Sequence, residues 1–100
     1  MLDKSFEKLL VELKYRPGVY IGKKSLERLS AFINGYMYCY YKHNGGPSDY
    51  LPGFQDYIEK KYGIQSTHGW SEIIRFFSTT EEEAFDSFFN LVNEFYNVNY

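Results

Sequence analysis

Apolar residues recur along this chain at intervals of three and four, the spacing of one face of an α-helix, in five separate stretches. The first follows Asp3, whose side chain can cap a helix, and ends before Pro17, because proline disfavours helical geometry in the residue that precedes it. The second follows Ser25 and reaches Tyr41 or Lys42. Its apolar residues continue at this spacing for about four turns, from Leu26 to Tyr40, so we expect this to be the central helix.

Glycine and proline mark one unusual position in the second helix and the limits of the third. Gly35 lies in the middle of the second helix, where glycine costs about 1 kcal/mol relative to alanine, so we expect another element to cross closely there. Pro52 suits the first turn of the third helix, and Gly63 is expected to end it. Ile64 then supplies the hydrophobic contact of a Schellman ending.

Two further helices are predicted near the end of the chain. The fourth opens at Ser66 or Thr67 and carries apolar residues inward as far as Phe77. The fifth follows residues 78–83, a run of hydroxyl and acidic residues that offers a capping box in three registers. Its inward face is expected to contain Ala84, Phe85, Phe88, Phe89, Val92, Phe95 and Tyr96.

These patterns predict an all-α protein in which residues 1–100 form one domain. A chain of 100 residues has the length of a single domain with one core. The only candidate strand is Val19–Ile21, a short extended piece expected between two turns. We therefore expect a compact bundle of about five helices, with the second and fifth as its long central pair.

The composition adds an excess of aromatic residues, with eleven Tyr and nine Phe. Rings must supply much of the core, but there are more of them than one small core needs. Tyrosine combines an apolar ring with a polar tip, so the surplus is expected at half-buried positions and at interfaces. Tyr38, Tyr41 and Tyr50 are the candidates for an interface, because Tyr38 and Tyr41 fall outside the inward face of the second helix.

Charge is distributed unevenly, although the net charge is only −2. Residues 1–50 contain eight Lys and Arg against five Asp and Glu, whereas residues 51–100 contain three against eight. From residue 79 onward there are five acids and no base. The outer face of the last helix is therefore expected to be acidic, with Glu82, Glu83, Asp86, Asn90, Asn93 and Glu94 on it.

Catalytic and metal chemistry find little support in the sequence. Cys39 and His43 are four residues apart, which would place them on one helical face, but a zinc site needs three or four ligands. His68 is the only other histidine and has no partner at a suitable spacing. We therefore expect no enzyme activity, no metal and no cofactor.

The compartment is indicated by what the sequence lacks. Cys39 is the only cysteine, so no internal disulfide can form. The first residues are charged and contain no apolar run with a cleavage site, so no signal peptide is expected. No apolar run approaches the roughly 20 residues that a membrane-spanning helix requires. We expect a cytoplasmic protein.

A basic region in the first half leaves one alternative function open. It comprises Lys14, Arg16, Lys23, Lys24 and Arg28. These residues flank a glycine- and proline-containing turn, and together they can attract phosphate groups. The alternative is therefore a small nucleic-acid or phosphate-binding module.

A resemblance covers more of the chain, from about residue 15 to residue 96. Its elements are Arg-Pro-Gly-x-Tyr-Ile-Gly at 16–22, Ser25-Leu26-x-x-Leu29 with Phe32 and Gly35, Trp70 with Ile73-Ile74, and the Glu-rich start and Phe-rich body of the last helix. This order resembles small bacterial immunity proteins. These are the cytosolic antidotes of contact-dependent inhibition and related polymorphic toxin systems, which bind and block a nuclease toxin domain.

The resemblance implies a non-enzymatic inhibitor whose partner is the C-terminal domain of a toxin, with no direct contact to nucleic acid or membrane. A nuclease binds a polyanion and exposes a cationic surface, which an acidic face can approach and cover. The expected toxin-binding residues are Glu82, Glu83, Asp86, Asn90, Glu94, Tyr38, Tyr41 and Tyr50. Reversing the charges of Glu82, Glu83 and Asp86 together is expected to weaken toxin binding without unfolding the protein.

Overall fold

The regular structure of this protein is helical. The computed structural model describes residues 2–45, 49–65 and 67–100, and these residues contain no β-strand. Six helices follow one another in this part of the chain: α1 (Lys4–Tyr15), α2 (Pro17–Tyr20), α3 (Leu26–Asn44), α4 (Phe54–Tyr62), α5 (Trp70–Phe76) and α6 (Glu81–Tyr96). The predicted all-α fold is confirmed, and the short helix α2 is added to the five predicted helices.

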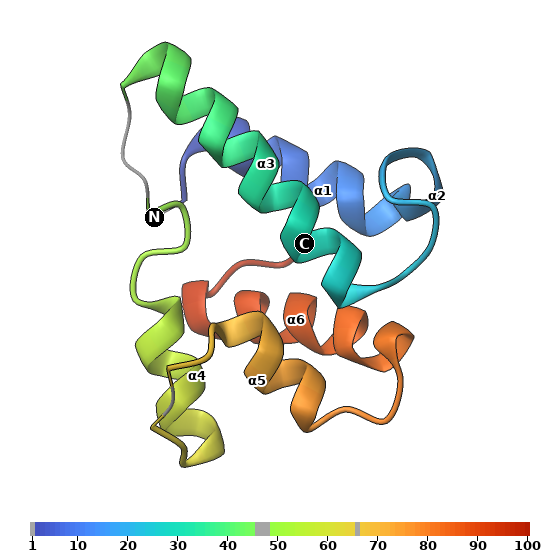
Figure 1. The fold of residues 1–100 in the computed structure, drawn as a ribbon, viewed down its shortest axis with the longest axis vertical. Helices are drawn as coiled ribbons and strands as arrows, with labels where there is room; N and C mark the ends of the chain where they lie inside the picture. Colours follow the sequence, from blue (N-terminus) through green and yellow to red (C-terminus); the bar gives the residue numbers. More distant parts are fainter. Residues whose placement is uncertain (1, 46–48, 66) are drawn as a thin grey trace.

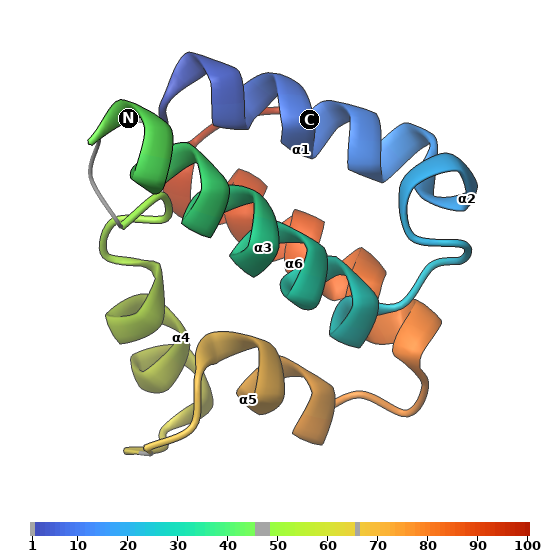
Figure 2. The same cartoon turned by 45° about the horizontal axis from the view of Figure 1, so that its top comes forward.

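The two longest helices, α3 and α6, form the centre of the fold. They pack against each other, and both contact α5. Figure 1 shows the course of the chain from α1 to α6, and Figure 2 shows α1 on one side of the central pair and α4 with α5 on the other. The expected central pair is therefore confirmed.

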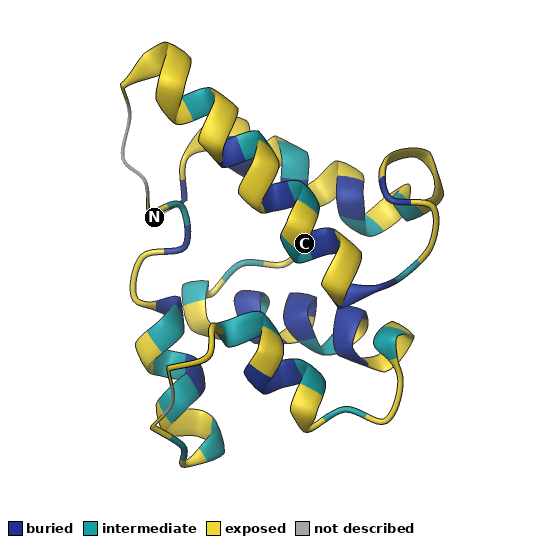
Figure 3. Cartoon of the chain, in the orientation of Figure 1, coloured by how far each residue is buried: buried dark blue, intermediate teal, exposed yellow. Residues whose placement is uncertain are grey.

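Phenylalanine, leucine and isoleucine fill the core, while tyrosine surrounds it. The largest fully buried side chains include Phe6, Phe54, Phe85, Phe88 and Phe89. None of the eleven tyrosines is buried: seven are half-buried and four are exposed. Figure 3 shows the buried positions along the inner sides of the helices. The expected surplus of tyrosine at half-buried positions is confirmed.

Side-chain caps begin three of the helices at the predicted residues. Asp3, Ser25 and Thr80 each accept a hydrogen bond from the backbone N–H three residues further on, at 3.1, 3.2 and 3.0 Å. Thr80 thus selects one of the three possible registers for the start of α6. Each cap satisfies a backbone donor that the first helical turn leaves without a partner.

The prediction of an extended piece at Val19–Ile21 was wrong. Pro17 instead begins the one-turn helix α2, since its fixed φ suits a first helical position and its missing N–H is not needed there. The backbone N–H groups of Ile21 and Gly22 both donate to the carbonyl oxygen of Pro17, at 2.8 and 3.1 Å. Gly22 then turns the chain toward α3 at a φ of 87°.

α3 and α4 each end at a glycine in the left-handed conformation. α4 ends at Gly63 in a Schellman pattern, in which Ile64 N–H donates to the carbonyl oxygen of Glu59 at 2.9 Å. α3 continues to Asn44, beyond the predicted Lys42, because the next residue that adopts a left-handed conformation is Gly45.

α4 and α5 both begin later than predicted. Pro52 lies before α4 rather than in its first turn, because the helix starts at Phe54. α5 starts at Trp70, and Gly69 precedes it without a side-chain cap. Thr67 is therefore not the cap of α5, and Ser66 lies outside the described residues.

The expected close crossing at Gly35 was wrong. Gly35 is exposed on α3, and a Cβ atom built there meets nothing within 4 Å. The glycine is therefore not required by any neighbouring element of the described chain. Its cost to the helix is not offset by packing.

Gly35→Ala is expected to raise the free energy of unfolding by about 0.5–1 kcal/mol, because alanine restricts the unfolded chain and has the higher helix propensity. Urea unfolding followed by circular dichroism measures this change. Gly53→Ala is the matched contrast, since Gly53 has a φ of 77° and a Cβ atom there would lie 3.1 Å from the Phe95 ring. We expect that variant to be less stable than the wild type, and equal effects of the two substitutions would contradict the prediction.

Candidate functional site

The predicted acidic face is present along the outer side of α6. Glu82, Asp86, Asn90 and Glu94 follow one another at four-residue intervals, which places them on one face of the helix. All four residues and Glu83 are exposed. Asn93, which was also expected on this face, is half-buried and accepts a hydrogen bond from the backbone N–H of Tyr100 at 3.0 Å.

Lysines from other parts of the fold neutralise two acids of this face. The Lys24 Nζ atom lies 2.7 Å from Asp86 Oδ1, and Lys61 of α4 forms an ion pair with Glu94. The hydrogen bond from Lys61, followed by one from the Tyr57 hydroxyl, lowers the pKa of the Glu94 carboxyl. The face is therefore acidic only in part, although α6 itself contains no base.

Uncompensated negative charge remains at the start of α6. Glu82 and Glu83 form no ion pair with any residue that the structure describes, and both are exposed. They lie in the first turn, where the helix dipole favours carboxylates. Of the acidic residues predicted to bind a partner, these two are the ones whose charge remains fully available.

Glu81 has a structural role that the sequence did not reveal. Its carboxylate accepts hydrogen bonds from the Glu27 backbone N–H at 3.0 Å, from Arg75 Nε at 2.6 Å and from Ser25 Oγ at 3.3 Å. Arg75 also contacts the Glu27 carboxylate at 2.7 Å. This cluster joins the starts of α3 and α6 to α5, and it supplies a partner for a backbone donor in the first turn of α3.

The pH dependence of stability should reveal this cluster. Burial raises the pKa of the Glu81 carboxyl, but the hydrogen bonds from Glu27, Arg75 and Ser25 outweigh it, so the pKa lies below its ordinary value of 4.5. A carboxyl whose pKa is lowered in the folded state stabilises the protein above its unfolded pKa. That contribution is lost as the pH falls through the folded pKa.

Glu81→Gln is therefore expected to lower the free energy of unfolding at pH 7 by about 1–2 kcal/mol, because charge-assisted hydrogen bonds are replaced by weaker ones. The difference from wild type should shrink below pH 4.5, the ordinary value from which the Glu81 pKa is lowered. Thermal unfolding across the pH range measures it. Glu82→Gln, at an exposed neighbouring acid, should change stability by no more than about 0.5 kcal/mol. A difference in stability between Glu81→Gln and wild type that persists at low pH would contradict this role of the Glu81 carboxylate.

Tyr38 and Tyr41 are available for binding, whereas Tyr50 is engaged within the fold. Tyr38 and Tyr41 are 66% and 52% exposed, so they do not cover α4 as packing residues. Tyr50 is half-buried, its ring packs 4.9 Å from that of Phe6, and its hydroxyl donates to Asn34 Oδ1 at 2.8 Å. Burial, aided by the charge of Asp49, raises the pKa of Tyr50 to about 12.

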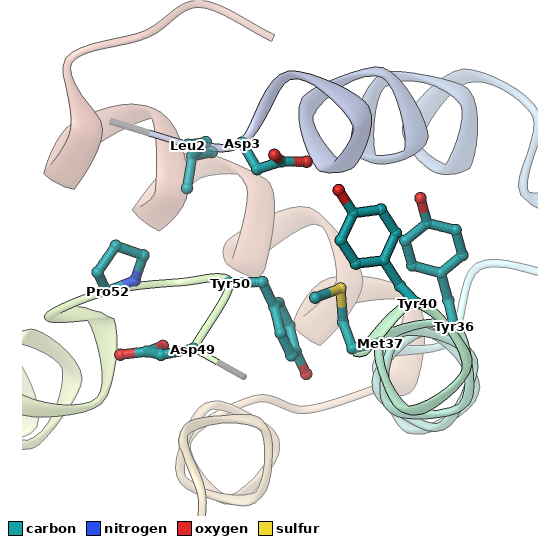
Figure 4. Close-up of a pocket in the computed structure, with 8 residues that line it drawn as sticks. All are labelled: Leu2, Asp3, Tyr36, Met37, Tyr40, Asp49, Tyr50 and Pro52. Carbon is teal, nitrogen blue, oxygen red and sulfur yellow. The ribbon is translucent and has the colours of Figure 1, made fainter. Parts of the chain in front are cut away.

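Tyr50 lines a pocket that the sequence did not predict. The pocket lies between residues 2–3, α3 and the segment before α4, and has a volume of about 390 Å³. Its polar lining comes from Asp3, Tyr36, Tyr40, Asp49 and Tyr50. Figure 4 shows the carboxylate of Asp3 on the same side as the hydroxyls of Tyr36 and Tyr40. These side chains come from three distant parts of the sequence.

The basic region of the alternative function is largely occupied by internal contacts. Lys14 donates to the backbone carbonyl of Tyr100, Lys24 pairs with Asp86, and Arg28 donates to the carbonyl oxygen of Ile21 at 2.9 Å. Arg16 and Lys23 are exposed. Three of the five bases are therefore engaged in contacts within the fold.

The sequence candidates for catalytic or metal chemistry do not assemble into a site. Cys39 and His43 are exposed on α3, and His68 Nδ1 contacts the Glu72 carboxylate four residues further on. Among the residues that the structure describes, no group of three His, Cys, Asp or Glu side chains could hold a metal ion. No helix in the same residues is long and apolar enough to cross a membrane.

Two aromatic residues that were predicted to point inward lie at the surface. Phe77 follows α5 and is 48% exposed, and its ring stacks on Tyr62 of α4 at 4.8 Å. Phe95 is 36% exposed and stacks on Tyr57 at 4.6 Å. The helical period placed them inward, but both lie near helix ends, where the neighbouring helices cover them only in part.

Comparison with known proteins gives no match to a family model, to a curated protein or to a solved structure. The fold and the surface define a small all-α protein with an acidic helix end, exposed tyrosines and a tyrosine-lined pocket.

Proposed function

We propose that this protein is a cytoplasmic bacterial immunity protein that binds the C-terminal domain of a cognate nuclease toxin and blocks its active site. Inhibition occurs by occlusion, without catalysis and without a cofactor. The observation that carries the proposal is the unpaired acidic start of α6, where Glu82 and Glu83 are exposed. The resemblance at residues 15–96 to small immunity proteins supports the same function.

Electrostatic attraction supports this mode of action. The active site of a nuclease must attract phosphate groups, so it presents positive potential to an approaching inhibitor. Carboxylates at the start of α6 are attracted to that potential and raise the rate of productive encounters. Asp86 and Glu94 contribute less, because Lys24 and Lys61 already balance their charges.

Exposed tyrosines supply the second part of the mechanism. Tyr38 and Tyr41 lie on the outer side of α3, and the Lys42 ammonium lies 5.5 Å from the Tyr38 ring centroid. Tyrosine is enriched among interface residues that contribute most to affinity, because it buries a large ring at a low entropy cost. In this proposal the acids set the association rate and the tyrosines set the dissociation rate.

Binding to the protein encoded by the adjacent upstream gene tests the function. Its C-terminal domain is purified, and calorimetry with this protein is expected to give a one-to-one complex with a nanomolar dissociation constant. The complex should lack the nuclease activity that the free domain shows on RNA or DNA. Absence of binding would overturn the proposal, and binding without loss of nuclease activity would overturn inhibition by occlusion.

A further inference from the structure

The pocket beside α3 combines aromatic rings with negative charge. Tyr36 and Tyr40 project from α3, and Tyr50 lines the pocket from the segment before α4, with its hydroxyl pointing away from theirs (Figure 4). Among the described residues that line it, Asp3 and Asp49 are charged and none is basic. A volume of about 390 Å³ lies in the range of pockets that bind small ligands.

The carboxylate of Asp3 is placed to receive a ligand. One of its oxygens, Oδ2, accepts the capping hydrogen bond from Phe6 N–H at 3.1 Å. The hydrogen bonds of the described residues leave the other oxygen without a donor. Figure 4 shows this carboxylate on the side toward which the hydroxyls of Tyr36 and Tyr40 point, whereas the Asp49 carboxylate points away from the rings. Asp3 is therefore the direct acceptor, and Asp49 adds negative potential at the rim.

Rings and carboxylates together favour a planar cation over other ligands. The face of a tyrosine ring attracts a cation, and a guanidinium group can stack on a ring while it donates two hydrogen bonds to a carboxylate. An anion would be repelled by both acids, and a purely apolar group would leave the Asp3 carboxylate without compensation. The chemistry of this pocket therefore matches the side chain of arginine.

We propose that the tyrosine pocket binds an arginine side chain of the protein partner, between the Asp3 carboxylate and the rings of Tyr36, Tyr40 and Tyr50. The identity of that partner as a nuclease toxin rests on the proposed function. A nuclease uses arginine to hold phosphate, so occupation of this pocket would remove such a residue from the substrate site.

A blocked tripeptide, acetyl-Gly-Arg-Gly-amide, tests the chemistry of the pocket without any toxin. Met37 lines the pocket and is one of only two methionines, so its labelled methyl group reports on binding by NMR. We expect a saturable shift of this signal, and titration to about 20 mM detects millimolar dissociation constants. The same peptide with citrulline, which keeps the shape but lacks the charge, should bind at least about tenfold more weakly.

Asp3→Asn is the decisive variant, because asparagine caps a helix as well as aspartate does but carries no charge. It should weaken binding of the arginine peptide about tenfold while the unfolding midpoint stays close to that of wild type. Glu12→Gln, which removes a carboxylate further along α1, should leave the affinity unchanged. No saturable shift, equal binding of the two peptides, or an Asp3→Asn variant that binds normally would overturn the pocket assignment.

Binding measurements with the toxin distinguish failure of the pocket assignment from failure of the proposed function. If the toxin binds wild type and Asp3→Asn equally tightly, the pocket does not receive its arginine, while the immunity function stands. If the arginine peptide binds in the pocket but the upstream protein does not bind, the pocket chemistry stands and the immunity function is overturned.

Discussion

Phe54→Ala is expected to lower the free energy of unfolding by about 3–5 kcal/mol, because truncating a buried aromatic residue removes apolar contacts and leaves a cavity. Phe54 is fully buried at the start of α4. Its ring centroid lies 5.5 Å from Trp70 of α5 and 5.8 Å from Phe88 of α6, in edge-to-face geometry. Phe54→Ala therefore removes packing contacts of α4 with both α5 and α6.

The matched control is Phe76→Ala, which removes the same atoms from a side chain that is 78% exposed. It should change stability by no more than about 0.5 kcal/mol. Denaturant unfolding with fluorescence detection measures both variants, since Trp70 is the only tryptophan and contacts Phe54 directly. Similar effects of the two substitutions would mean that the packing of Phe54 against Trp70 and Phe88 contributes little to stability.

Local chemistry made most of the helices predictable. The caps at Asp3, Ser25 and Thr80 depend on residues three positions apart, and the Gly63 ending depends on its immediate neighbours. The inward face of α6 follows from the helical period, and Ala84 through Val92 are buried at the expected spacing. Such features need no information about the distant parts of the chain.

Expectations that depended on other elements were less successful. Gly35 suggested a close crossing, but glycine propensity alone cannot reveal whether a second helix approaches. Val19–Ile21 contains residues that favour strands, yet no neighbouring strand exists in the described residues to pair with it, and Pro17 starts a helical turn instead. In both cases the expected neighbouring element is not present among the described residues.

In the candidate site, too, local features could be predicted and contacts between distant residues could not. The line of acids on α6 could be predicted from its four-residue spacing, but the lysines that pair with Asp86 and Glu94 come from other parts of the fold. The cluster around Glu81 and the tyrosine pocket likewise assemble side chains that are far apart in sequence. Residue type and spacing therefore identified the exposed acids, while the structure identified which of them keep their charge.

Reversing both exposed acids at the start of α6, with Glu82→Lys and Glu83→Lys, is expected to slow association with the toxin by about 10–100-fold at low salt. Dissociation should change less, because the tyrosines of α3 are untouched. Stopped-flow kinetics at several salt concentrations measure the association rate. Asp86 is omitted from this variant because a lysine there would face Lys24. The repulsion between the two lysines would destabilise the fold, and an effect on stability could then be mistaken for an effect on binding.

A second double variant, Glu12→Lys with Asp56→Lys, separates local from general electrostatics. Both double variants change the net charge from −2 to +2, since each substitution adds two charges, but Glu12 and Asp56 lie on α1 and α4. If the start of α6 faces the toxin, the first variant must slow association far more than the second, and high salt must reduce the difference. Equal slowing would mean that only net charge matters. An unchanged rate in the first variant would instead assign the interface to the face of α3 that carries Tyr38 and Tyr41.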